Sequence, residues 1–247
     1  MNRRRATLFL IAGVMLCLLG VAVFFAATPG EVVSQEMGNT QFVGSETCAD
    51  CHADEYNQHV LHGHNYKLNA VVDGQPPEYP FSEVSEPPAG YTWDDISFVI
   101  GGFAWKARFI DLEGYIITGD EDATTQYNFP LIDDRTGDVI IEAGWVPYHA
   151  GEVDRPYSCG SCHTSGYNHN PETNMYDLPG LVGQWEEEGI QCEECHGAGS
   201  NHLEDPIVFE MRVDRDSEAC GACHYRGVEG VVEASGGFVK HHEQYGE

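Results

Sequence analysis

The chain has 247 residues, enough for one large domain or two small ones, and its 28 glycines and 12 prolines indicate a loop-rich fold. Its 40 acidic and 12 basic residues give a formal net charge of −28, which excludes nucleic acid as a partner because such binding needs a basic surface. So strong a negative charge also opposes contact with anionic lipid or with another acidic protein unless salt screens it.

The first 30 residues are expected to direct export. Arg3, Arg4 and Arg5 precede an uncharged run, residues 6–27, that is long enough to span a bilayer. Residues 1–30 are therefore predicted to be a signal peptide or an N-terminal membrane anchor, and membrane contact is expected only through this segment, if it stays uncleaved. The remainder is expected outside the cell or at its surface, with a periplasmic or membrane-anchored location as the alternative.

Three further segments follow in the chain. Residues 31–90 hold a flexible link, a first Cys-x-x-Cys-His sequence, a helix expected over 55–61 and an acidic, proline-rich loop over 73–90. Residues 91–150 are β-rich, with strands expected over 96–100, 104–110, 115–117 and 139–141 and a hairpin turn over 111–114. Residues 151–247 carry three more Cys-x-x-Cys-His sequences and little regular pattern.

Eight of the nine cysteines occur in four identical Cys-x-x-Cys-His frames, the signature of c-type haem attachment. Two cysteines three positions apart lie on one side of a helical turn, where both sulfurs reach the two vinyl groups of one porphyrin, and the next residue donates a nitrogen to iron. The predicted attachment residues are Cys48, Cys51, Cys159, Cys162, Cys192, Cys195, Cys220 and Cys223, and the predicted proximal ligands are His52, His163, His196 and His224.

Other uses of paired cysteines explain the sequence less well. Zinc ribbons do not need a histidine after every pair, thioredoxin-like sites use a single pair on a βαβ unit, and disulfides leave the four histidines unexplained. Four molecules of haem c are therefore predicted as cofactors. They are expected to form the core of a mostly irregular multihaem cytochrome c fold with few short helices and a small β-rich hairpin segment, because the last third has too few apolar residues for an ordinary core.

A second axial ligand is needed at each iron, and eight further histidines exceed that need, which favours bis-histidine haems used for electron transfer. His202 lies too close to His196 in the sequence to reach the opposite face of the same haem, so it is expected to bind a neighbouring one. His169 is placed in an exposed turn, and His64 is preferred over His59 and His62. Five candidates remain for four positions: His64, His149, His202, His241 and His242.

Several strings resemble the OmcE-like multihaem (tetrahaem) cytochromes, an extracellular cytochrome filament family. These strings are residues 44–48, 63–68, 91–93, 100–106, 157–164 and 241–245, and they include Gly-Gly-Phe-Ala-Trp-Lys and His-His-Glu-Gln. The resemblance as a whole extends over most of the chain, from about residue 42 to the end. The resemblance implies a continuous stack of bis-histidine haems, polymerisation of the chain, and a distal histidine that can come from the neighbouring subunit. On this pattern His64, His149, His202 and the His241–His242 pair match ligand positions.

The predicted function is therefore electron transfer rather than catalysis. An exported tetrahaem cytochrome would carry electrons between closely stacked haems, with other copies of itself and redox proteins or an extracellular acceptor as partners. The alternatives are a multihaem reductase of the nitrite or hydroxylamine type, which needs an open iron site, and a monomeric periplasmic or membrane-anchored shuttle.

Overall fold

The computed structural model describes residues 40–133, 135–170, 172–212 and 217–224. The chain divides into two compact units, Met1–Thr40 and Gln41–Glu247, and the second contains all four Cys-x-x-Cys-His motifs. The predicted export segment, residues 1–30, lies outside the described ranges. Within those ranges, no helix is long and apolar enough to cross a membrane.

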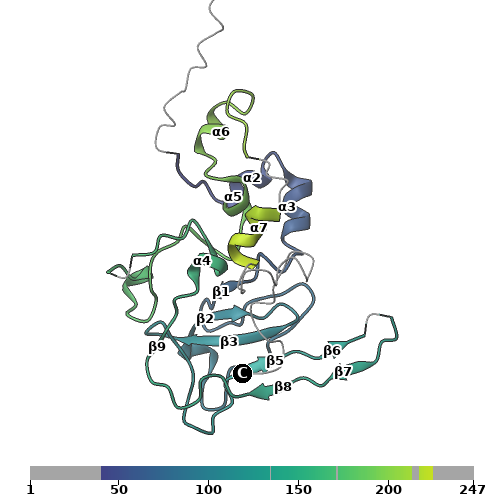
Figure 1. The fold of residues 1–247 in the computed structure, drawn as a ribbon, viewed down its shortest axis with the longest axis vertical. Helices are drawn as coiled ribbons and strands as arrows, with labels where there is room; N and C mark the ends of the chain where they lie inside the picture. Colours follow the sequence, from purple (N-terminus) through teal and green to yellow (C-terminus); the bar gives the residue numbers. More distant parts are fainter. Residues whose placement is uncertain (1–39, 134, 171, 213–216, 225–247) are drawn as a thin grey trace, which may run out of the picture. The chain divides into compact units, whose positions relative to one another are not determined.

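The helices of the second unit are short, as the sequence predicts. The one expected over 55–61 is present as α3, and four others carry the Cys-x-x-Cys-His motifs. The described elements are α2 (Ser45–Ala49), α3 (Ala53–His59), α4 (Gly160–His163), α5 (Cys192–His196), α6 (Ser200–Glu204) and α7 (Ser217–His224), with 3-10 turns at Trp93–Asp95 and Met175–Asp177 (Figure 1).

A seven-stranded antiparallel sheet forms the other part of this unit (Figure 1). Its main path runs β1 (Leu68–Ala70), β2 (Ile96–Gly101), β3 (Lys106–Asp111), β4 (Tyr115–Ile116) and β9 (Arg155–Pro156). A branch adds β5 (Gln126–Asn128), which pairs with β3, and β8 (Gly144–Val146), which pairs with β5. Two small ribbons complete the set: β6 (Leu131–Ile132) with β7 (Val139–Ile141), and β10 (Thr164–Ser165) with β11 (Glu187–Glu188).

This sheet is larger than the small hairpin segment expected from the sequence. The predicted strands appear as β2, β3, β4 and β7, but β1, β5, β8 and β9 were not predicted. Each of these four is only two or three residues long, too short to show an alternating pattern. They become strands because they pair with distant segments, as Leu68 in β1 does with Ile100 in β2.

Two glycines make the turn from β2 to β3. Gly101 and Gly102 have φ angles of +76° and +96°, a region that residues with a side chain rarely adopt. A Cβ atom on Gly102 would lie 2.2 Å from the Tyr79 hydroxyl oxygen, and one on Gly101 would lie 2.5 Å from the Lys106 carbonyl oxygen. The Gly-Gly part of the Gly-Gly-Phe-Ala-Trp-Lys string is thus required by the backbone.

Each face of the sheet packs its own apolar cluster. Phe98, Ile100 and Ile110 pack with Tyr157 and Trp185 on one face, while the alternate residues of β2 and β3, including Val99 and Phe109, pack on the other. The partly buried Cys159 packs against the first cluster. The sheet therefore provides an apolar support directly beneath the second Cys-x-x-Cys-His motif.

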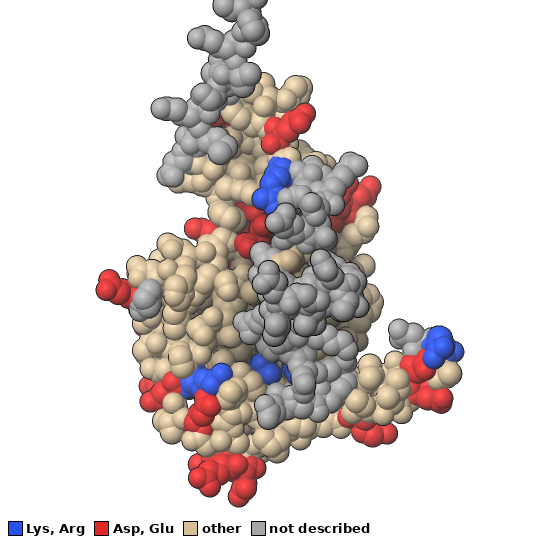
Figure 2. Space-filling view, viewed as in Figure 1, with Lys and Arg blue, Asp and Glu red and all other residues tan. Residues whose placement is uncertain are grey.

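The surface carries the acidic excess of the sequence. Figure 2 shows acidic side chains at several separate places on the visible face, with few basic ones between them. Three ion pairs are present among the described residues, two of which join Glu152 to His149 and to Arg155. Most of the negative charge is thus without a basic partner in this part of the chain, so solvent ions must screen it.

Candidate haem-attachment site

Each Cys-x-x-Cys-His motif lies on or at the end of a short helix. α4 ends at His163, α5 spans Cys192–His196 and α7 ends at His224. α2 contains Cys48, and the backbone N–H groups of Cys51 and His52 in the turn that follows bond to the Cys48 carbonyl oxygen. A single helical turn places the two cysteines of a motif on one side, as attachment to one porphyrin requires. None of the eight motif cysteines forms a disulfide in the structure.

The four motifs are brought together in two pairs. α2 packs against α5 and α4 packs against α7, so the first motif lies beside the third and the second beside the fourth. The Cys48 thiol interacts with that of Cys192, and burial together with this neighbour raises the pKa of Cys48 to about 11. In the other pair, burial and the adjacent Cys162 thiol raise the pKa of Cys223 to about 12.

An electrostatic interaction between thiols relates the two pairs. The pKa of Cys195, in the third motif, is raised by burial, then by Glu194 and by Cys220 of the fourth motif. The thiols therefore follow one another in space in the order first, third, fourth, second motif. This order differs from the order in the sequence and leaves no motif isolated from the other three.

Three candidate ligands have their imidazoles oriented through Nδ1. His163, His196 and His202 direct Nδ1 at the carbonyl oxygens of Lys67, Arg212 and Phe209, at 3.0, 2.7 and 2.8 Å. A carbonyl oxygen only accepts, so Nδ1 carries a proton in each ring, and in the neutral imidazole Nε2 is then the nitrogen with the lone pair. Histidines that bind metals through Nε2 are commonly held in this way.

Two candidate distal histidines lie beside proximal histidines of other motifs. The His52 and His202 ring centroids are 6.3 Å apart with planes inclined by 25°, and those of His64 and His224 are 5.9 Å apart with planes inclined by 65°. Burial, followed by Lys67 and the nearby histidines, lowers the pKa of His64 to about 4. Its ring is therefore neutral at physiological pH, the form that binds metals.

The other histidines near the first motif have different contacts. His59 Nε2 lies 3.1 Å from Gln191 Oε1, an acceptor, so Nε2 of that ring carries a proton. Burial lowers the pKa of His59 as well. His62 lies beside His64, with ring centroids 4.8 Å apart, and its Nδ1 accepts the His64 backbone N–H at 3.3 Å.

His149 and His169 lie apart from these pairs in the described structure. His149 has a left-handed backbone (φ +48°), donates from Nδ1 to Glu152 at 2.7 Å and contacts the Tyr148 ring. His169 is exposed and contacts Tyr167, in keeping with the exposed turn expected for it. Among the described residues, no proximal histidine ring lies beside either of them. The remaining candidates, His241 and His242, lie outside the described ranges.

The donor set fits haem c in its chemistry. Each motif offers two thiols and one imidazole on a single helical turn, and two motif histidines have a second imidazole whose ring centroid is 5.9–6.3 Å away. A zinc site needs about four such ligands in one cluster, and no group of three or more cysteine, histidine or acidic side chains gathers in that way within the described ranges. When bound, haem c supplies an iron that accepts and releases single electrons.

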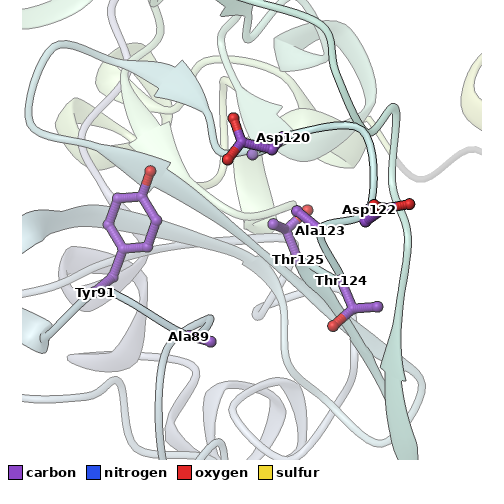
Figure 3. Close-up of a pocket in the computed structure, with 8 residues that line it drawn as sticks. Ala89, Tyr91, Asp120, Asp122, Ala123, Thr124 and Thr125 are labelled. Carbon is purple, nitrogen blue, oxygen red and sulfur yellow. The ribbon is translucent and has the colours of Figure 1, made fainter.

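One pocket lies elsewhere, between the loop around Tyr91 and the segment that leads into β5 (Figure 3). Its volume is about 440 Å³ and it is lined by Ala89, Tyr91, Gly119, Asp120, Asp122, Ala123, Thr124 and Thr125. None of these residues belongs to a motif. The pocket is open and acidic, and it is separate from the residues predicted to hold haem.

Comparison with known proteins supports the cytochrome interpretation. The family model described as "Cytochrome c554 and c-prime" matches residues 146–197, which include the second and third motifs. This stretch resembles a c-type cytochrome. The match covers about a fifth of the chain, and it supports haem c as the cofactor and electron transfer as the use of the haem-binding part. No curated protein matches the sequence.

Three solved structures that resemble the chain are multihaem proteins. They are the outer cell wall cytochrome OcwA (22% identity, TM-score 0.46), an undecahaem cytochrome from the S-layer of Carboxydothermus ferrireducens (20%, 0.44) and the octahaem sulfite reductase MccA of Wolinella succinogenes (19%, 0.44). The alignments cover 75–76% of this chain but only 38%, 25% and 35% of those chains. The chain thus spans less than two fifths of each of these larger proteins.

Two residues that the sequence analysis did not single out hold the site together. Glu193 and Glu194 fill the variable positions of the third motif, and their carboxylates accept backbone hydrogen bonds next to the first and second motifs. The feature of the sequence that could have pointed to them is a pair of adjacent acidic residues within a haem motif. Gln191 was also missed, and its side chain contacts both His59 and Asn65.

Proposed function

We propose that the chain is an exported tetrahaem c-type cytochrome that carries electrons along four haems attached at its four Cys-x-x-Cys-His motifs. The observation that carries the proposal is the pairing of the motif helices, α2 with α5 and α4 with α7. The electrostatic interaction between the Cys195 and Cys220 thiols supports a link between the two pairs. Covalent haems at these positions would form one continuous group, and electrons would pass along it in the order first, third, fourth, second. Such a group needs no substrate pocket.

The proposed axial ligation follows from the histidine pairs. His202 serves as the distal ligand of the haem whose proximal ligand is His52, and His64 does so for the haem of His224. The haems of His163 and His196 then take their distal ligands from His149, His241 and His242. His149 is exposed and has no described proximal histidine beside it, which suits donation to a neighbouring subunit.

Polymerisation with copies of the same chain is the second part of the proposal, and it is supported by the sequence resemblance. The net charge of −28 opposes contact between copies, so assembly is expected only where salt screens that repulsion. The proposed location is outside the cell or at its surface, because the first 30 residues carry the features of an export segment.

The experiment uses holoprotein secreted by a host that attaches haem c. Mass spectrometry should find four covalent haems per chain, and the absorption and EPR spectra should show only low-spin haem in the assembled form. Negative-stain microscopy at several salt concentrations should show filaments at high salt. Unmodified cysteines would overturn the cytochrome assignment, and monomers under every condition would overturn polymerisation.

The same sample tests the alternative of a multihaem reductase. A reductase keeps one iron open to substrate, so it shows a high-spin signal and binds carbon monoxide or nitrite. A conduit with two imidazoles at every iron binds neither. Binding of about one carbon monoxide per assembled chain would therefore favour the reductase and contradict the proposed ligation.

A further inference from the structure

The third motif contains a buried carboxylate that the proposed electron path does not itself explain. Glu193 is 1% exposed, although it lies at a position where the haem-attachment signature requires no particular residue. No lysine, arginine or histidine forms an ion pair with it in the described part of the chain. An unpaired acidic side chain is rarely found so deeply buried, so its other contacts must compensate for the loss of water.

Those contacts are backbone N–H groups from two different segments. Oε1 accepts from Gly199 at 2.7 Å and from Val43 at 3.0 Å, and Oε2 accepts from Gly44 at 2.8 Å and from Val43 at 3.0 Å. Val43 and Gly44 lead directly into α2 and the first motif, while Gly199 precedes α6 and His202. One carboxylate therefore binds the entrance to the first motif and the segment that carries its candidate distal ligand.

Two neighbouring contacts strengthen the same junction. The backbone N–H of Ser45 donates to Glu187 at 3.0 Å, and the Ser45 hydroxyl accepts the backbone N–H of Cys192 at 3.3 Å. Ser45 is 4% exposed. The first residue of α2 is thus joined to the first residue of α5, which places the Cys48 and Cys192 thiols side by side.

The adjacent carboxylate serves the second motif. Glu194 Oε2 accepts the backbone N–H of Gly166 at 3.0 Å, three residues after His163. Successive residues of a helix point in directions about 100° apart, so neighbouring side chains reach different segments. The two variable positions of the third motif therefore contact the segments that flank the first and the second motif.

Hydrogen bonds to a carboxylate are stronger than those between neutral groups, and here they replace the helix or strand pairing that these segments lack. We propose that Glu193 is a positioning residue: it fixes the first haem motif and His202 against the third motif, and its buried negative charge lowers the reduction potentials of the haems attached there. Glu194 fixes the second motif in the same way. The inference rests on the proposed function for its redox part only, because the backbone contacts exist without haem.

A buried anion favours the oxidised, more positively charged iron, and its effect is larger where water is excluded. Glu193→Gln keeps the size of the side chain but removes the charge and turns an NH₂ group toward backbone donors. We therefore expect the midpoint potentials of the affected haems to shift to more positive values in spectroelectrochemical titration. The Soret circular dichroism couplet that arises between closely spaced haems should weaken as the first and third motifs separate.

The contacts of the Glu193 carboxylate with the backbone N–H groups of Val43, Gly44 and Gly199 form a clamp, and hydrogen exchange tests it without reference to redox chemistry. In the wild-type holoprotein the amides of Val43, Gly44 and Gly199 should exchange slowly, although none of them is bonded within a helix or strand. In Glu193→Gln they should exchange about tenfold faster, the factor expected for the loss of one strong hydrogen bond. In Glu194→Gln the Gly166 amide should be the one that loses protection.

Glu46→Gln is the matched control, because it removes the same charge from an exposed side chain two residues before Cys48. It should change neither the potentials nor the protected amides. Potentials unchanged in Glu193→Gln, or shifted equally in Glu46→Gln, would overturn the electrostatic role, and rapid exchange of the three amides in the wild type would overturn the clamp. If Glu193→Gln gives no holoprotein, the exchange rates of the three wild-type amides still test the clamp. Absence of haem would contradict the proposed function but not the clamp, because hydrogen exchange tests the backbone contacts of Glu193 independently of haem.

Discussion

The imidazoles of His52 and His202 lie with their centroids 6.3 Å apart and their planes 25° apart, although His52 closes the first motif and His202 follows the third. The His202 ring is held by its Nδ1 bond to the Phe209 carbonyl, and its segment is held by Glu193 through Gly199. Both imidazoles of this pair are therefore positioned by the fold before any cofactor is considered. The predictions below use this relationship and three others.

Replacement of His202 by alanine should open one iron of the four. We expect the haem attached at Cys48 and Cys51 to become high-spin and to bind carbon monoxide, at about one equivalent per chain. EPR and carbon monoxide titration of the holoprotein measure both changes. His169→Ala is the control, because this side chain is exposed and its Nδ1 lies 3.3 Å from the Tyr167 hydroxyl oxygen rather than beside a proximal histidine. Four low-spin haems in His202→Ala would exclude the proposed pairing.

Replacement of His64 should have the same effect on a different haem. The ring centroids of His64 and His224 are 5.9 Å apart, so His64→Ala is expected to open the iron of the haem attached at Cys220 and Cys223. The neighbouring His62→Ala and His59→Ala should leave all haems low-spin, because His59 uses Nε2 to donate to Gln191 and His62 uses Nδ1 to accept the backbone N–H of His64. A high-spin signal from His59→Ala, with none from His64→Ala, would reverse this assignment.

Gly102→Ala should destabilise the sheet. The left-handed backbone alone costs a residue with a side chain about 1–2 kcal/mol, and the new methyl group would also collide with Tyr79. Gly90→Ala is a matched control, since its φ of +94° is close to the +96° of Gly102 but nothing lies within 4 Å of its Cβ position. Chemical denaturation should give a loss at least about 1 kcal/mol larger for Gly102→Ala. Equal losses would show that Tyr79 moves aside freely.

Lys106 should make the stability of the protein depend on pH in the alkaline range. Burial, followed by the neighbouring Arg108, lowers the pKa of Lys106 from 10.5 to about 8. Between these values the unfolded chain binds more protons than the folded one, so the free energy of unfolding gains a term that rises with pH. Lys106→Met lacks this term. Between pH 7 and pH 10 its free energy of unfolding, measured by chemical denaturation, should therefore increase less, or decrease more, than that of the wild type. The same pH slope in both proteins would contradict the low pKa.

The sequence was most informative where the chemistry is local. The strands over 96–100 and 115–117 and the hairpin turn over 111–114 lie in continuous β-rich sequence, and the short helix after His52 was expected within two residues of its ends. The two-residue strand β9 was not predictable, because Arg155 and Pro156 have no strand pattern of their own and pair with β4 only in the folded chain. Likewise, nothing in the local sequence around Glu193 indicates that its carboxylate reaches Val43.

The amino-acid sequence by itself determined which cysteines and histidines form each attachment motif, because those residues lie within five positions of one another and need only one helical turn. Only the tertiary structure decided that the first motif lies beside the third and the second beside the fourth, and that His202 and His64 approach His52 and His224. These contacts join residues far apart in the chain, where packing of the sheet and buried carboxylates outweigh any local preference of the sequence.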